Sequence, residues 1–422
     1  MIKKLSVIIY WSLIIILLCL FFSNDFGLID IRKTSIIVAV GVDLEEDEVQ
    51  VTAQLAVPQP SENGENVQYT QVQGSGKTIA DALNEINSKT GYYPKLLFCK
   101  LVLVGDECKK ENLFKVLSCL YRRNYSELTP LVAMCGGKAS DMLSMTSSVD
   151  PETSEAITQV LSTELEKSAN VSSINLKDLA EQNFSVSGAC YLPYVEANVP
   201  GTSEKGGNGD AVGGDKAQSG QGESGGGESG QSEGGGGQSA SGGSSGGGGS
   251  AKGGEVEFTA RKTAFFQDGE FKGIIDEQQS FALDVIKNQI RLAVLPFNYD
   301  NTHYTLGLKG VSCKVKMKVK ESVPTLTVNF KAKAQVQGIL TIISPEKVSN
   351  DDVVKKEILQ TAGEEIKSRI NALFETCKST GCDLFGAKNL LHKYNHKYFN
   401  AFKDDLLSRL NIEYKIDIQS NN

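Results

Sequence analysis

The chain has little of two residue types that mark many functional sites. Among its 422 residues there are three histidines and one tryptophan, which leaves little material for a histidine-rich metal centre. It also lacks a basic excess, because 43 lysines and arginines face 51 aspartates and glutamates, and the formal net charge is −8. A nucleic-acid-binding protein needs a basic footprint, so this balance argues against that class.

Cysteine is present, but its spacing is not that of a metal site or a disulfide framework. None of the nine cysteines forms a CxxC pair, and most lie in apolar or alternating segments, where a free thiol behaves as a small hydrophobe. The closest pair, Cys377 and Cys382, can either form a disulfide or remain as free thiols at a helix end. We therefore expect no disulfide framework.

The first thirty residues indicate the compartment. Residues 5–22 form an 18-residue apolar run whose only polar members are Ser6, Tyr10 and Ser12. A run of this length is just sufficient to cross a bilayer as a helix. Two lysines precede it and two aspartates follow it, so we predict one transmembrane helix with the rest of the chain outside the cytoplasm.

Two other fates of this segment stay open. A cleaved signal peptide needs small residues just before its cleavage site, and residues 21–31 offer no clear pair of this kind. Lipid attachment at Cys19 needs a small residue directly before the cysteine, where Leu18 stands. Both fates therefore fit the sequence less well than an uncleaved anchor does.

Residues 201–254 differ in composition from the rest of the chain. They hold 24 of the 42 glycines and ten serines, with no aromatic residue. Such a segment cannot bury enough apolar surface to offset the entropy of ordering it, so we predict that it is disordered. It is either a linker between domains or a long loop within one small domain. We favour the loop, because strands are expected on both sides of it and loop closure costs little more as length grows.

The rest of the chain shows both helical and strand periodicity. The expected strands are 35–42, 48–57, 67–73, 96–104, 131–135, 185–195, 255–267, 311–320, 326–337 and 412–418. The expected helices are 77–88, 111–121, 139–145, 151–167, 176–182, 352–374 and 388–410. Pro324 is expected to mark the turn between two of the strands. The fold class is therefore α+β and multidomain, with mixed sheets packed against helices and an N-terminal transmembrane helix.

This pattern leads to a division into four parts. We expect an N-terminal anchor at residues 1–28 and an N-terminal α/β domain at 29–150. A middle domain follows at 151–283, interrupted by the insert at 201–254, and a C-terminal α+β domain occupies 284–422.

Lysines gather on one side of two expected strands. Because strand side chains alternate, a hairpin of 311–320 and 326–337 places six lysines on one face, namely Lys314, Lys316, Lys318, Lys320, Lys331 and Lys333. One interpretation is a solvated face that resists edge aggregation, paired with Glu413 and Asp417 of the last strand. The other is a surface that meets an acidic partner or anionic lipid.

Apparent chemical motifs do not hold. Residues 74–78 (GSGKT) resemble the end of a phosphate-binding loop, but Gln71 stands where that loop needs its first glycine. His392 and His396 are spaced to share a metal on a helix, but lack the glutamate of HExxH, so a solvated helix face is the preferred interpretation. No catalytic, cofactor-binding or metal residue is therefore singled out, and an enzyme is disfavoured.

Five segments in order resemble a known family more strongly than any motif does. They are 29–33 (IDIRK) with 36–43 (IIVAVGVD), 74–82 (GSGKTIADA), 93–105 (YPKLLFCKLVLVG), 263–276 (TAFFQDGEFKGIID) and 382–398 (CDLFGAKNLLHKYNHKY). Together they resemble the C subunit of spore germinant receptors, the Ger(x)C family, over about residues 29–200 and 255–422. Family members usually carry a lipid-attachment cysteine directly before an opening Trp-Asp pair, and this chain has Leu28 and Ile29 in the places of the cysteine and the tryptophan. The insert is not part of the common family core.

The resemblance implies a function and partners. It implies a non-enzymatic, extracytoplasmic receptor subunit without a cofactor, located at the inner membrane of a dormant spore. Its partners would be the multi-pass A subunit, the transporter-like B subunit and the membrane, with no nucleic acid. The alternatives are a membrane-anchored solute-binding or cell-wall-binding module, and a wall hydrolase with an unrecognised carboxylate pair.

Overall fold

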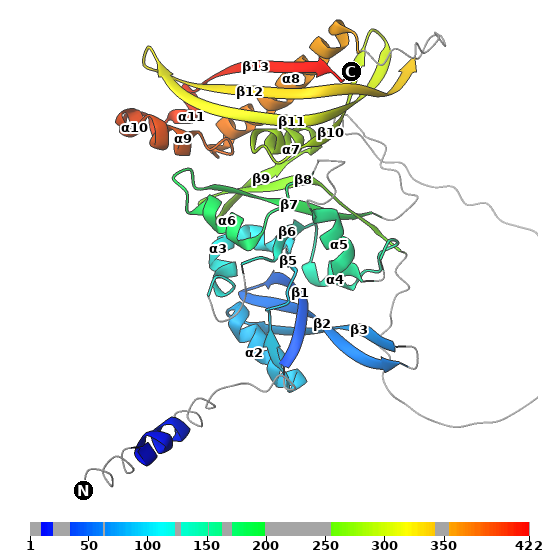
Figure 1. Ribbon diagram of the computed structural model, residues 1–422, viewed down its shortest axis with the longest axis vertical. Helices are drawn as coiled ribbons and strands as arrows, with labels where there is room; N and C mark the ends of the chain where they lie inside the picture. Colours follow the sequence, from blue (N-terminus) through cyan, green and yellow to red (C-terminus); the bar gives the residue numbers. More distant parts are fainter. Residues whose placement is uncertain are drawn as a thin grey trace, which may run out of the picture.

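The computed structural model combines two sheets with helices that pack between and beside them (Figure 1). It describes residues 10–19, 34–61, 64–122, 128–150, 152–162, 171–198, 255–341 and 354–421. One sheet has nine strands and the other has four, and both mix parallel and antiparallel pairs. The predicted α+β class with mixed sheets is therefore confirmed.

The predicted N-terminal span lies only partly within the described residues. Residues 10–19 are helical, and the rest of 5–22 lies outside them. Within the part of the chain that the structure describes, no helix combines the length and apolarity needed to cross a bilayer.

The larger sheet is built from residues 34–275 in the order β3-β2-β1-β5-β6-β7-β8-β9, with β4 paired to β1. Its strands are β1 (Thr34–Glu45), β2 (Glu48–Ser61), β3 (Gly64–Gly76), β4 (Tyr93–Lys95), β5 (Leu101–Val104), β6 (Leu131–Cys135), β7 (Ala189–Asn198), β8 (Glu257–Gln267) and β9 (Glu270–Ile275). The central strands β1, β5, β6 and β7 are parallel to one another, while both ends of the sheet are antiparallel. This sheet extends through the residues assigned to the first two globular domains, whose boundary at residue 150 stays a prediction.

Helices cover both faces of this sheet and create two cores. On one face α2 (Ile79–Thr90) packs on β2 and β3, and on the other α4 (Ala139–Ser144) and α5 (Thr153–Leu161) pack on β1 and β8. The buried carboxylate of Asp43 accepts hydrogen bonds from the first backbone N–H groups of α4, at Ala139 (2.7 Å) and Ser140 (2.9 Å). This contact satisfies donors that have no partner within the helix.

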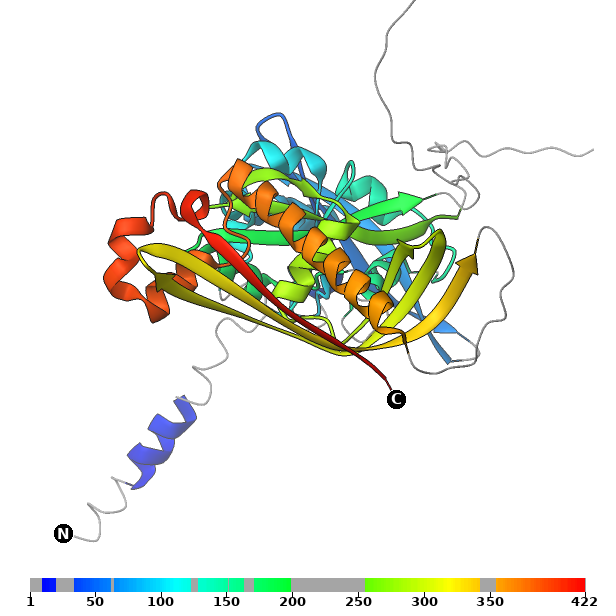
Figure 2. The same ribbon diagram turned by 90° about the horizontal axis from the view of Figure 1, so that it is seen from above.

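The smaller sheet forms the C-terminal part in the order β10-β11-β12-β13. Its strands are β10 (Leu292–Tyr299), β11 (Thr302–Lys320), β12 (Val323–Thr341) and β13 (Asn411–Ser420). The long helix α8 (Lys356–Thr380) lies diagonally across one face (Figure 2) and contacts β10 and β13. The other face carries the lysines of β11 and β12.

One helix joins the two sheets. Helix α7 (Glu277–Ile286) contacts β8 of the larger sheet and both α8 and β11 of the C-terminal part. Every residue from Ser280 to Ile286 is buried. Through α7 a single hydrophobic core runs from Ile37 to Leu410, so the two sheets share one packed interior.

Two predicted helices are wrong in extent. The segment 388–410 is three short helices, α9 (Ala387–Tyr394), α10 (His396–Phe402) and α11 (Leu406–Arg409). The chain leaves helical geometry at Asn395 (φ −137°, ψ 42°), whose side-chain amide donates to the Met317 carbonyl on β11 (3.1 Å). Similarly, the segment 111–121 contains the short α3 (Leu113–Val116), followed directly by the 3₁₀ helix η3 (Leu117–Cys119). A further 3₁₀ helix, η2 (Asp106–Lys110), ends just before this segment.

Two strand predictions also need correction. The turn between β11 and β12 is formed by Glu321 and Ser322, both at positive φ, and Pro324 lies inside β12 opposite Val319. The strand predicted at 96–104 begins only at Leu101, because Leu97 and Phe98 before it form an exposed turn. Strands β4, β9 and β10 and helix α7 were not predicted. The remaining predicted elements are present with shifted ends, although 163–167 and 352–353 of two predicted helices lie outside the described residues.

The strands that flank the glycine-rich insert pair with each other. Strands β7 and β8 are antiparallel, and the register runs from Ala189 opposite Gln267 to Asn198 opposite Glu257. This pairing agrees with a loop between neighbouring strands of one sheet. The insert itself, residues 201–254, lies outside the described residues.

We predict that replacing residues 201–254 with a short Gly/Ser turn leaves cooperative thermal unfolding intact. The ends of the loop are already held together by strand pairing, and shortening a loop of this length lowers the entropic cost of closing it by about 2 kcal/mol. The melting temperature should therefore stay equal or rise. A loss of cooperative unfolding would show that the segment or its length is structural.

Candidate functional site

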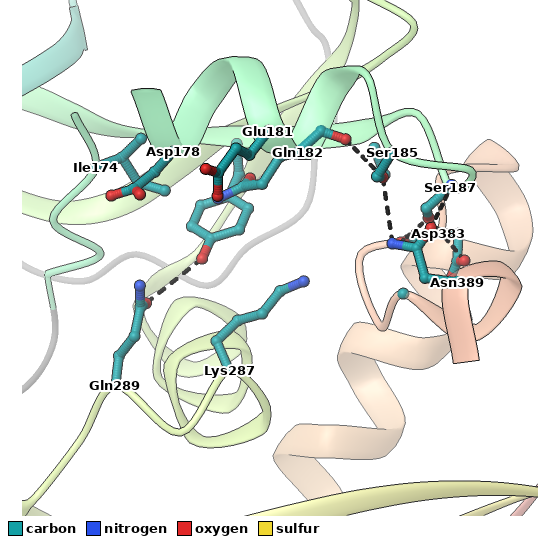
Figure 3. A pocket seen from close by; sticks show the side chains of 13 residues that line it. Ile174, Asp178, Glu181, Gln182, Ser185, Ser187, Lys287, Gln289, Asp383 and Asn389 are labelled. Carbon is teal, nitrogen blue, oxygen red and sulfur yellow. Dashed lines mark hydrogen bonds between the residues drawn. The ribbon is translucent and has the colours of Figure 1, made fainter. Parts of the chain in front are cut away.

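A polar pocket of about 400 Å³ lies where the larger sheet meets the C-terminal helices (Figure 3). One wall is formed by α6 (Leu176–Asn183) and β7, and the other by residues just after α7 and at the start of α9. Its polar lining includes Asp178, Glu181, Gln182, Ser185, Ser187, Tyr191, Lys287, Gln289, Asp383 and Asn389. Residues far apart in the sequence therefore meet here.

Asp383 holds the two walls together. Its buried carboxylate accepts hydrogen bonds from the backbone N–H groups of Ala387 (2.9 Å) and Lys388 (2.8 Å) at the start of α9. It also accepts one from the Ser187 hydroxyl (2.7 Å) across the junction. Asn389 adds a second link, because its side-chain oxygen accepts from the Ser187 N–H (2.8 Å). Burial raises the pKa of Asp383, and these hydrogen bonds to the charged form oppose the rise.

Lys287 supplies the pocket with a cation. Its side chain extends into the space between α6 and the start of α9 (Figure 3), and its ammonium lies 5.6 Å from the centre of the Tyr191 ring. Burial lowers the pKa of Lys287, and the negative charge of Asp383 opposes that change. Among the described residues none forms an ion pair with Lys287. The ammonium is thus available to an anionic group in the pocket.

A second buried carboxylate lies close to this pocket. Asp284 on α7 accepts a hydrogen bond from the Ser172 hydroxyl through one oxygen, while its other oxygen has no hydrogen-bond partner among the described residues. Burial raises the pKa of Asp284 to about 7, although the Ser172 hydrogen bond favours the charged form. Asp284 therefore carries a proton over much of the acidic range.

The lysine face is the second candidate site. It is the face of the β10–β13 sheet opposite to the one that α8 covers. Each lysine on it lies opposite a residue of the neighbouring strand. The strand register places four lysines of β11 opposite uncharged residues of β12: Lys314 opposite Asn329, Lys316 opposite Thr327, Lys318 opposite Thr325 and Lys320 opposite Val323. Lys331 of β12 lies opposite Ser312 of β11. The predicted sharing of one face is confirmed: Lys314 lies directly opposite Asn329, and Lys331 lies two positions further along β12 on the same side. Lys309, Lys333 and Lys415 extend the same face.

Few charges neutralise this face. Lys320 pairs with Glu413 (2.6 Å) and Lys331 approaches Asp417 (4.0 Å), the two acidic residues of β13. Within the described ranges no ion pair involves Lys314, Lys316 or Lys318, all of which are exposed. A protein with a net charge of −8 thus presents a strongly basic sheet face.

The phosphate-loop-like segment has a structural role. A Cβ on Gly74 would lie 2.3 Å from the carbonyl oxygen of Ala82, so glycine allows α2 to pack closely on β3. Thr78 then caps α2 by accepting a hydrogen bond from the Asp81 N–H (3.2 Å). The segment is therefore a helix start, as the missing first glycine indicated.

The histidines and cysteines do not form a site within the described residues. His392 and His396 are both exposed with ring centres 4.8 Å apart, and no group of three possible metal ligands occurs in the part of the chain that the structure describes. Eight cysteines are buried free thiols, including Cys377 and Cys382, and burial raises the pKa of Cys377 to about 12. Buried thiols of this kind are poor nucleophiles.

The sequence-based reasoning did not identify the pocket residues or the neighbouring Asp284. Asp284 and Lys287 stand in an otherwise apolar stretch (FALDVIK), and a charge inside such a stretch is the one signal that was available. Asp383 and Ser187 have no comparable signal, because they meet only through the tertiary fold.

Two family models match this chain, one after the other in sequence. Residues 28–197 match the family described as "Spore germination protein N-terminal domain", and residues 261–421 match "Spore germination B3/ GerAC like, C-terminal". A solved structure described as "Crystal Structure of the GerBC protein" is similar, with a TM-score of 0.48 and 12% identity over 91% of this chain and 97% of that chain. No curated protein matches the chain.

We predict that Asp284→Asn makes the protein less sensitive to alkaline pH. The folded-state pKa of about 7 exceeds the unfolded value of 3.8, so the folded state binds more protons between these values and its stability falls as pH rises through this window. Relative to the variant, the wild type should lose roughly 4 kcal/mol of unfolding free energy between pH 4 and pH 8. Denaturant unfolding at several pH values measures this difference, with the exposed Asp47→Asn as the matched control. Parallel pH profiles for wild type and Asp284→Asn would contradict the prediction.

Proposed function

Because the chain belongs to the Ger(x)C family of spore germination proteins, we propose that it is the extracytoplasmic C subunit of a germinant receptor complex. In this proposal the apolar run 5–22 anchors it in the spore inner membrane, and the folded part associates with the A and B membrane subunits. Its role is non-enzymatic: it is needed for nutrient-triggered germination through this association.

The observation that carries the proposal is the pair of family matches in chain order. They cover residues 28–197 and 261–421, which include most residues of both sheets. The residues between them are largely the insert, 201–254. The match therefore concerns the whole folded part and not one shared motif.

The fold supports a role in association. The core that runs through α7 connects the smaller sheet to the larger sheet, so a displacement of one sheet reaches the other through packed side chains. The lysine face offers a basic surface to an acidic partner, and such complementarity favours correct encounter and orientation. We therefore place the contact with a membrane subunit on the lysine face.

The buried polar groups support a non-enzymatic role. The Asp383 carboxylate is occupied by hydrogen bonds to two backbone N–H groups and a hydroxyl. The buried thiols have raised pKa values and lack the exposure of a nucleophile. The hydrogen bonds of Asp383 stabilise the junction between the two sheets.

We predict that changing Lys314, Lys316, Lys318 and Lys331 to Gln weakens binding to the A and B subunits by at least ten-fold at low salt. Each change removes an exposed positive charge from the lysine face, so the loss should shrink as salt screens the wild-type attraction. Co-purification of the full chain with membranes that contain the A and B subunits, at two salt concentrations, measures it.

A matched control removes four lysines from other surfaces, namely the exposed Lys110, Lys115 and Lys177 and the half-buried Lys367. Both variants change the net charge equally, so only a specific surface effect separates them. Equal binding of the two variants, with melting temperatures unchanged, would rule out the lysine face as the contact.

The pocket favours a second candidate function, a membrane-anchored solute-binding module. It combines the ammonium of Lys287 with the carboxylates of Asp178 and Glu181, which suits a small zwitterion. We expect glycine or a related zwitterion to raise the melting temperature of the wild type and not of Lys287→Met. Acetate and a simple amine test each charge separately, and no shift with any of the three would contradict solute binding.

A further inference from the structure

We propose that a patch of apolar side chains beside the start of β1 rests in the membrane interface and sets the orientation of the folded part. The patch consists of Ile36 on β1 and four residues of 92–98: Tyr92, Tyr93, Leu97 and Phe98. It is called the apolar patch below. The proposal relies on the membrane anchor of the proposed function.

The apolar patch is a group of exposed apolar side chains and not a single one. Leu97 and Phe98 are 53% and 57% exposed, and Tyr92 and Tyr93 are 49% and 39% exposed. Single exposed apolar residues are ordinary, but a group of them on neighbouring segments marks an interaction surface. The turn that carries Leu97 and Phe98 is anchored below by Leu96 and Cys99, both of which are buried in the core.

Strand pairing holds the apolar patch next to the point where the chain enters the fold. Thr34, the first described residue of β1, lies opposite Tyr93, and Ile36 lies opposite Lys95. The turn then returns to β1, where the N–H of Lys100 donates to the carbonyl of Val38 (2.8 Å). The apolar patch therefore spans the first four or five residues of β1, about 13 Å along the strand.

The length of chain before β1 limits where the bilayer lies. The apolar run ends at residue 22, and residues 23–33 number 11 before Thr34. Fully extended, they reach about 40 Å at most. A helix anchored at 5–22 thus keeps the start of β1, and with it the apolar patch, close to the bilayer surface.

The chemistry of the apolar patch suits this place. Tyrosine combines an apolar ring with a hydroxyl and is enriched where membrane meets water. Leucine and phenylalanine add apolar area for shallow insertion. Lys95, between Tyr93 and Leu97 in the sequence, supplies a positive charge for anionic headgroups. The patch therefore matches a bilayer interface better than open water.

This placement has a consequence for the lysine face. In Figure 1, β1 and α2 lie at the end of the molecule remote from the β10–β13 sheet. With the apolar patch at the bilayer, the lysine face is held away from the lipid headgroups. In the proposed function it then contacts an acidic part of a membrane subunit that extends beyond the bilayer surface.

Tryptophan fluorescence in the full chain tests the proposal. Trp11 is the single tryptophan and lies in the apolar run, so Trp11→Phe combined with Phe98→Trp places the only indole in the apolar patch. The protein is reconstituted into vesicles of phosphatidylcholine and phosphatidylglycerol, with or without acyl chains brominated near the headgroup. We expect bromine to lower the emission at position 98 at least two-fold. The matched control, Trp11→Phe with Tyr394→Trp, places an indole at a 64% exposed site of α9 and should not be quenched.

The possible outcomes distinguish a failure of this inference from a failure of the proposed membrane anchor. Quenching of wild-type Trp11 without quenching at position 98 or at a second probe, Leu97→Trp, would leave the anchor in place and overturn the inference. A blue-shifted emission at position 98 that bromine does not change would also overturn it, because the chain's own residues or a partner would then cover the patch. Quenching at position 98 but not of Trp11 would support the patch and contradict the anchor.

Discussion

Helix α7 is buried between the two sheets, and its packing fixes how the two sheets are arranged relative to each other. This helix presents apolar side chains to both sides, and Phe281, Leu283 and Val285 are almost completely buried. Each such burial contributes roughly 1.5–3 kcal/mol. The Arg369 guanidinium of α8 stacks over Phe281 at 5.3 Å, so the C-terminal helix is tied to the same point. Without α7 the two sheets would each expose a face to water.

The same junction explains why charged groups are buried here. Asp383 links the start of α9 to Ser187, which lies just before β7 of the larger sheet. A carboxylate in this position is costly to bury, and the cost is offset only when the hydrogen bonds from both sides are in place. The junction is therefore specific to one arrangement of the two sheets. A rigid arrangement of this kind fits the association with membrane subunits proposed above.

The surface divides into regions with different chemistry. The apolar patch lies beside the start of β1, and the lysine face covers the outer sheet at the opposite end. A bilayer attracts the first, whereas the second needs an acidic surface. Because the packed core connects them, the distance and the angle between these two surfaces are fixed. Contact at one surface therefore limits what the other can reach.

The sequence alone determined the elements whose side chains face two different environments. Strands such as β2, β11 and β12 alternate between core and solvent, and α2 and α8 have one apolar stripe, so their periodicity was readable. The lysine face followed from the same alternation. Segments such as 74–82 and 382–398, which occur in the same order as in the family, indicated the family.

The remaining features depend on contacts between segments that are distant in the sequence. Helix α7 is buried on all sides and so has no apolar stripe to detect. The continuous pattern of 388–410 hides a break at Asn395, because that break is stabilised by a hydrogen bond to β11, which is distant in sequence. The pocket joins Lys287, Asp383 and Ser187 from three separate segments. Local periodicity reports the environment of each side chain, but it carries no record of which distant segment provides that environment.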